Sequence, residues 1–137
     1  MKKILFSALV LTALTLTACG GNPSSTETAS TAPLAAVPVE YSGRANPLGA
    51  QAAASGADLY KVNCASCHGD GGRGDGVAGQ SLLPKPVNLV ELNKIAGDAY
   101  LFWRIYEGKP GTSMVPWRGI LTDEQIWQVV AFIRTLK

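Results

Sequence analysis

The 137-residue sequence has few of the residues that many binding and catalytic sites require. It contains a single histidine, His68, and charged side chains make up only 16% of the chain. Its 12 basic and 10 acidic residues nearly balance, and the basic ones form no patch of the kind that binds nucleic acid. No segment alternates polar and apolar residues over the length of a strand. We therefore expect an all-α protein with no nucleic-acid partner.

The longest apolar run lies near the N-terminus and is too short to cross a membrane. Lys2 and Lys3 precede an apolar stretch over residues 4–16, whereas a spanning helix needs about 20 residues. The run Leu-Thr-Ala-Cys that ends at Cys19 resembles the lipobox of bacterial lipoproteins, whose signal peptide is cut before an acylated cysteine. We interpret residues 1–18 as a lipoprotein signal peptide. The alternative is an ordinary signal peptide with an incidental cysteine.

The chain after Cys19 has the composition of a tether. Residues 20–38 are rich in glycine, proline, serine, threonine and alanine, and they cannot bury enough apolar surface to fold. Residues 39–49 are not a typical linker, because they contain large and polar residues such as Tyr41. This stretch could pack against the domain or against a partner. We assign residues 19–50 to a lipidated N-terminus and flexible tether, and residues 51–137 to a folded domain.

The other two cysteines belong to the pentapeptide C-A-S-C-H at residues 64–68, which is the attachment motif of c-type haem. The thiols of Cys64 and Cys67 can each bond a vinyl group of the porphyrin, and His68 then lies beneath the iron. A bare C-x-x-C also suits a redox disulfide or half a zinc site, but the adjoining histidine favours haem. With Cys19 acylated, no cysteine is left over for a structural disulfide. We therefore predict one covalent haem c.

The second axial ligand of the iron follows by elimination. A second histidine is excluded, and Met1 leaves with the signal peptide, so Met114 is the remaining methionine. It lies in a turn-rich loop, K-P-G-T-S-M-V-P, at residues 109–116. A lone methionine is commonly core filler, and lysine and tyrosine are formal alternatives as ligands. Beside a haem attachment motif we predict that Met114 ligates the iron, which raises the reduction potential.

Three further residues are candidates for the haem pocket. A ligated histidine holds its second ring nitrogen toward an acceptor. Pro84 and Pro86 lie in an extended stretch, and the carbonyl of either could accept this bond; their spacing does not choose between them. Trp117 follows the methionine loop and is expected to line the pocket, with packing in the core as the alternative.

The spacing of apolar residues predicts helices throughout the folded domain, whereas the glycine-rich residues 69–79 predict a loop around the cofactor. Thr122 and Gln125 form a T-x-x-Q capping box at the start of the last helix. Asp98 is the expected N-cap of the preceding helix, and Gly108 its stop. Helices are expected over residues 52–63, 90–95 and 99–107, and from residue 122 toward the C-terminus.

Residues 51–137 resemble a small class I cytochrome c. Gly56 and Tyr60, ahead of the haem motif, resemble the N-terminal helix of that family, and residues 123–134 resemble its C-terminal helix. In the family these helices cross with a glycine against an aromatic ring, which Gly56 and Phe132 match here. The resemblance implies an all-α fold in which short helices and loops surround one covalent haem.

The same resemblance implies electron transfer. Together with the lipobox, it extends to mono-haem lipoprotein cytochromes of respiratory or photosynthetic membranes, including the mono-haem subunit of alternative complex III. The expected partners are redox proteins: a quinol-oxidising complex, a terminal oxidase, a reaction centre or a soluble carrier. The expected location is the outer, periplasmic side of a bacterial membrane. One departure is Val115, because many members have proline directly after the ligand methionine.

Two other functions compete with electron carriage. A haem enzyme such as a peroxidase needs an open sixth position and usually a distal acid or base. Here the only histidine is proximal, and Met114 is expected to close the iron, so we predict that the protein is not an enzyme. The remaining alternative is a haem-containing sensor or assembly lipoprotein.

Overall fold

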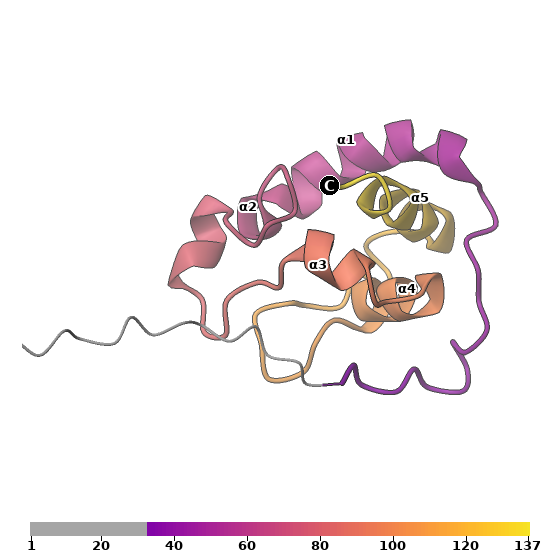
Figure 1. The fold of residues 1–137 in the computed structure, drawn as a ribbon, viewed down its shortest axis with the longest axis horizontal. Helices are drawn as coiled ribbons and strands as arrows, with labels where there is room; N and C mark the ends of the chain where they lie inside the picture. Colours follow the sequence, from indigo (N-terminus) through magenta and orange to yellow (C-terminus); the bar gives the residue numbers. More distant parts are fainter. Residues whose placement is uncertain (1–32) are drawn as a thin grey trace, which may run out of the picture. The chain divides into compact units, whose positions relative to one another are not determined.

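Two helices from opposite ends of the domain, α1 (Ala53–Asn63) and α5 (Asp123–Ile133), pack against each other (Figure 1). The computed structural model describes residues 33–137, and the predicted signal peptide and Cys19 lie outside the described residues. Within residues 33–137 the regular elements are all helical, which confirms the all-α prediction. None of the described helices has the length and apolarity that crossing a membrane requires.

Gly56 sets how closely α1 approaches α5. A Cβ at this position would collide with the carbonyl oxygen of Gln128 and would lie 3.0 Å from the Cβ of Phe132. One turn later, the ring of Tyr60 packs on that of Phe132 with centroids 4.9 Å apart. The predicted contact between Gly56 and Phe132 is confirmed, and only glycine permits this separation of the backbones.

The start of α5 is fixed by its own side chains. The hydroxyl of Thr122 accepts a bond from the backbone N–H of Gln125 (3.2 Å), and the Gln125 side chain accepts one from the N–H of Thr122 (2.9 Å). This confirms the predicted capping box. The buried face of α5 then supplies much of the core, at about 1.5–3 kcal/mol for each large apolar side chain. Its fully buried members are Ile126, Val129 and Val130.

Helix α4 (Asp98–Glu107) begins one residue earlier than predicted. Its N-cap is Gly97, and Asp98 is the first helical residue rather than the cap. The Asp98 carboxylate instead accepts bonds from the backbone N–H of Asn46 (3.0 Å) and from Nε of Arg134 (2.8 Å). The predicted cap is therefore wrong, because long-range partners occupy the carboxylate.

The connections contain more helix than expected. The short helix α3 (Leu89–Asn93) starts one residue before the predicted 90–95 and ends two residues before it. It is capped by Asn88, whose side chain accepts bonds from two backbone N–H groups. The glycine-rich segment is a loop as far as residue 76. It then enters a 3₁₀ helix, η2 (Val77–Ser81), which the loop prediction missed. A second 3₁₀ turn, η1 (Ala50–Ala52), leads into α1.

The compact unit begins at Pro33, earlier than the boundary at residue 51 that the sequence suggested. We call residues 33–49 the N-terminal strap; it runs beside α4 before turning toward α1 (Figure 1). Tyr41 is the buried anchor of the strap, and its hydroxyl donates to Glu107 (2.7 Å). Three further strap residues pack partly buried against the core: Leu34, Val37 and Leu48.

Candidate haem site

The attachment motif occupies one tight turn directly after α1. Cys64 joins α1 to the four-residue helix α2 (Ala65–His68), with its backbone N–H bonded to the carbonyl of Tyr60 (2.8 Å). The backbone N–H of His68 bonds back to the carbonyl of Cys64 (2.9 Å). Cys64 and Cys67 are both half-buried free thiols. Two thiols three positions apart, and the imidazole next to the second of them, are thus presented from a single turn.

The ring of His68 is oriented by a backbone carbonyl. Its Nδ1 lies 3.3 Å from the carbonyl oxygen of Val87. Since a carbonyl can only accept, this contact places the proton on Nδ1 and leaves Nε2 free to bind a metal. Burial lowers the pKa of His68, although the bond to Val87 acts in the opposite direction. The imidazole is therefore neutral near pH 7, as a metal ligand must be.

The acceptor for His68 is neither of the two prolines that the sequence suggested. The carbonyl of Pro86 faces the glycine loop, where a Cβ on Gly74 would collide with it. Successive carbonyls of an extended chain point to opposite sides, so the next one, that of Val87, faces His68. The prediction of Pro84 or Pro86 as acceptor is wrong for this reason. Their predicted place in the haem pocket stays a prediction.

The glycine loop packs against the carbonyl end of α2. A Cβ on Gly76 would collide with the backbone of α2, and one on Gly79 with the carbonyl of Cys67. The N–H of Gly74 bonds to the carbonyl of His68 (2.8 Å). On the other side of the motif, the buried hydroxyl of Tyr60 donates to the carbonyl of Gly69 (2.8 Å). These contacts hold the haem-attachment turn from both sides.

The methionine loop is fastened at its base. Gly108, at φ +70°, lies so close to the loop that a Cβ there would be 2.5 Å from the carbonyl oxygen of Met114. The same carbonyl accepts a bond from the N–H of Lys109 (2.9 Å), and the N–H of Met114 bonds to the hydroxyl of Thr112 (3.2 Å). Beyond the methionine, the N–H of Trp117 bonds to the carbonyl of Ile105 (3.1 Å). The loop is thereby tied to the C-terminal turn of α4.

The residues of the turn and of the loop meet the same core. Cys64, Met114 and Trp117 are all partly buried and pack against one cluster of buried residues. Pro86 is half-buried and Pro84 is exposed. Whether Trp117 and the prolines line the haem pocket stays a prediction.

The donor set fits a covalent haem better than a zinc ion. Within residues 33–137, Cys64, Cys67 and His68 do not form a group that could hold a metal ion, and neither do any other three His, Cys, Asp or Glu side chains. Burial, followed by the neighbouring Cys67, raises the pKa of the Cys64 thiol to about 12, so Cys64 carries a protonated thiol near pH 7 in the protein without a bound group. Free thiols suit thioether bonds, and His68 and Met114 offer the nitrogen and sulfur of a His/Met iron site.

Residues 51–133 match the family model of cytochrome c oxidase, cbb3-type, subunit III. The chain belongs to this family. Membership implies a c-type haem and haem-based electron transfer, and the match includes the attachment motif, the glycine loop, the methionine loop and all of α5. The N-terminal strap lies outside it.

A solved structure with a similar fold is the reducing HAO-like protein complex Kustc0457/Kustc0458 of Kuenenia stuttgartiensis. The two chains are 36% identical and superpose with a TM-score of 0.55. The alignment covers 59% of this chain and 40% of that chain, so this cytochrome matches less than half of its neighbour. The similar chain is therefore part of a protein complex.

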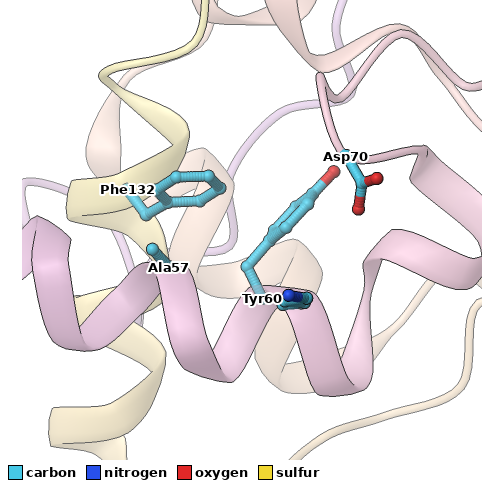
Figure 2. Close-up of a pocket in the computed structure, with 5 residues that line it drawn as sticks. Ala57, Tyr60, Asp70 and Phe132 are labelled. Atoms are coloured by element: carbon cyan, nitrogen blue, oxygen red, sulfur yellow. The ribbon is translucent and has the colours of Figure 1, made fainter.

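A surface cleft of about 270 Å³ lies apart from the predicted haem ligands of this cytochrome. Figure 2 shows Phe132, Tyr60 and Asp70 around it, between α1, α5 and the start of the glycine loop. The hydroxyl of Tyr60 already donates to the carbonyl of Gly69, so the cleft has no free buried polar group there. Its volume falls below the usual range for ligand pockets, and we assign it no chemistry.

Proposed function

We propose that the protein is a one-electron carrier with a single haem c, bonded covalently to Cys64 and Cys67 and ligated by His68 and Met114. The proposal is carried by the orientation of His68, whose Nδ1 is committed to the carbonyl of Val87 beside two free thiols. The haem supplies reversible one-electron chemistry. The chain orients the imidazole, keeps it neutral and brings a fastened loop with a soft sulfur ligand to the same core.

The methionine loop favours a carrier over an enzyme. A peroxidase-like reaction needs an open position on the iron and a side chain that moves protons there. Residues 109–118 contain no aspartate, glutamate or histidine. Beyond Met114 their backbone is bonded to α4 through Trp117 and Arg118, and before it Lys109 bonds to the carbonyl of Met114. The sulfur of Met114, held in this loop, would fill the sixth position of the iron. It provides no acid or base for moving protons there.

We further propose that the electrons come from and go to other redox proteins on the outer side of a bacterial membrane. The similar chain from Kuenenia stuttgartiensis belongs to a protein complex, which supports a protein partner. The lipobox supports a membrane location. A quinol-oxidising complex, a terminal oxidase, a reaction centre or a soluble carrier would each fit this description.

A lipid on Cys19 would hold the haem domain close to the bilayer. The compact unit begins only 14 residues after that cysteine, at Pro33. Even a fully extended chain of this length spans at most about 50 Å. We therefore propose a carrier that reaches partners near the membrane surface, with a shorter reach than a tether ending at residue 50 would allow.

The spectrum of the purified native protein tests the closed His/Met site. We expect the ferric form to show the weak near-infrared absorption of an iron–sulfur(thioether) bond near neutral pH. We also expect the ferrous form to bind carbon monoxide slowly, because Met114 must first leave. Absence of the near-infrared band, together with immediate binding of carbon monoxide, would reject the closed carrier in favour of an open haem site.

The anchor is tested separately with Cys19→Ser. We expect the wild-type protein to sediment with membranes and to incorporate labelled fatty acid, and the variant to lose both properties while keeping its haem spectrum. Ser24→Ala, just beyond the lipobox, is the matched control and should stay on the membrane. Release of wild-type protein by a high-salt wash, with no incorporated label, would show peripheral attachment instead of a lipid anchor.

A further inference from the structure

One carboxylate joins the N-terminal strap to the methionine loop. Glu107 is the last residue of α4, and its Oε1 accepts a bond of 2.7 Å from the hydroxyl of Tyr41 in the strap. Its other oxygen, Oε2, forms an ion pair with the guanidinium of Arg118, which follows the methionine loop. The two partners of Glu107 thus come from segments far apart in the chain.

The strap is a fixed support for this contact. Asn46 donates its side-chain N–H to the carbonyl of Trp127 in α5 (2.8 Å) and its backbone N–H to Asp98 in α4 (3.0 Å). The guanidinium of Arg44 lies over the ring of Tyr41, 5.3 Å from its centroid. The ring of Tyr41 also packs on those of Phe102 and Tyr106 in α4. Tyr41 is therefore held independently of its bond to Glu107.

The loop side of the contact leads directly to Met114. The backbone N–H of Arg118 bonds to the carbonyl of Tyr106 (3.2 Å), beside Glu107. Gly108, the residue after Glu107, lies against the carbonyl of Met114. A shift of Glu107 would therefore move the start of the methionine loop through Gly108, and a shift of Arg118 would move its end.

We propose that the strap latches the methionine loop: Tyr41 is a positioning residue that acts through Glu107 and Arg118 to keep Met114 on the iron. The inference rests on the proposed His68/Met114 site and deepens it. The bond from a buried phenol to a carboxylate is of the charge-assisted kind, which is stronger than a bond between neutral groups. Desolvation raises the pKa of Tyr41, so its hydroxyl keeps the proton that it donates.

Tyr41→Phe tests the latch, because it keeps the ring and removes only the donor. The measurement is the rate at which the ferrous holoprotein binds saturating carbon monoxide, which is limited by the departure of Met114. A hydrogen bond to a charged group contributes more than about tenfold to an equilibrium, and only part of that reaches Met114 through Glu107, so the rate should rise roughly threefold to tenfold. Glu107→Gln should change it in the same direction, since it removes the ion pair with Arg118.

Two controls separate a latch from general loosening of the fold. Tyr106→Phe removes a hydroxyl from the same aromatic cluster that makes no hydrogen bond within residues 33–137. Asn93→Ala removes partly buried bonds to Ile133 and Arg134, away from both haem ligands. Both should leave the rate within about twofold of wild type, even where Asn93→Ala lowers the unfolding temperature.

The outcomes also separate this inference from the proposed function. If the wild type shows the near-infrared band but Tyr41→Phe binds carbon monoxide at the wild-type rate, the latch is rejected and the carrier stands. An equal increase in Asn93→Ala rejects the latch as well, because it indicates general loosening. If the wild type lacks the band and binds carbon monoxide at once, the His/Met site itself is rejected.

Discussion

Replacing Met114 with alanine is expected to lower the midpoint potential by roughly 0.1–0.3 V, a fraction of the approximately 0.8 V that axial ligands span. A thioether is a neutral, soft ligand that favours ferrous iron, and its loss leaves water or a harder ligand in the sixth position. The near-infrared sulfur band should disappear, and carbon monoxide should bind the ferrous protein without delay. Potentiometric titration with optical detection measures the potential, and a carbon monoxide difference spectrum measures access.

The substitution should leave the loop itself in place. The bonds from Lys109 to the carbonyl of Met114, and from the N–H of Met114 to Thr112, use the backbone and the neighbouring side chain rather than the sulfur. Val115→Ala is the matched control, because Val115 is adjacent and exposed. It should leave the spectrum and the potential unchanged. An unaltered spectrum in Met114→Ala would exclude Met114 as ligand and return attention to a lysine or tyrosine.

The features that the sequence predicted correctly are those whose causes are local. The capping box pairs residues three positions apart, and the haem motif lies within one turn, so neither depends on the rest of the fold. The contact between Gly56 and Phe132 is long-range, but the resemblance to class I cytochromes supplied it. Helical periodicity fixed the buried face of α5, because one apolar stripe repeats along it.

The sequence did not predict that the N-terminal strap packs on the domain, because the residues that anchor the strap do not belong to a periodic pattern. Tyr41 and Asn46 stand in a stretch with no helical or strand periodicity. Their partners Glu107, Asp98 and Trp127 are 66, 52 and 81 residues away. Composition therefore assigned this stretch to a tether, although the hydrogen bonds of Tyr41 and Asn46 and the packing of Leu34, Val37 and Leu48 hold it on the domain. The sequence signal was a set of residues that a linker does not need: Tyr41, Arg44, Asn46 and Pro47.

The two local errors have the same origin. Asp98 has the side chain of an N-cap, but Arg134 and Asn46 compete for its carboxylate and leave Gly97 at the cap position. The acceptor for His68 depends on which way each carbonyl of an extended segment points. That direction is set by the packing of the Pro86 carbonyl on the glycine loop and cannot be read from the presence of proline.

Gly56→Ala is expected to destabilise the holoprotein by about 3 kcal/mol, at the upper end of the usual cost of overpacking. The added methyl group meets the carbonyl oxygen of Gln128, which belongs to the backbone of α5 and cannot rotate away. Alanine improves helix propensity by about 1 kcal/mol, which offsets only part of the clash. For a domain of this size the unfolding temperature should fall by roughly 10–20 °C. Circular dichroism during thermal unfolding measures it.

Gly71→Ala is the matched control, because it adds the same methyl group where there is room. The nearest atom to a Cβ at Gly71 is Nε of Arg73 at 3.7 Å, an ordinary contact with a flexible side chain. Its stability should therefore stay within about 0.5 kcal/mol of wild type. At low temperature Gly56→Ala should keep the near-infrared band, because the haem ligands belong to other elements. Equal unfolding temperatures for the two variants would mean that α1 and α5 are farther apart in solution than in this fold, since no rearrangement of side chains alone can admit a methyl group against the carbonyl of Gln128.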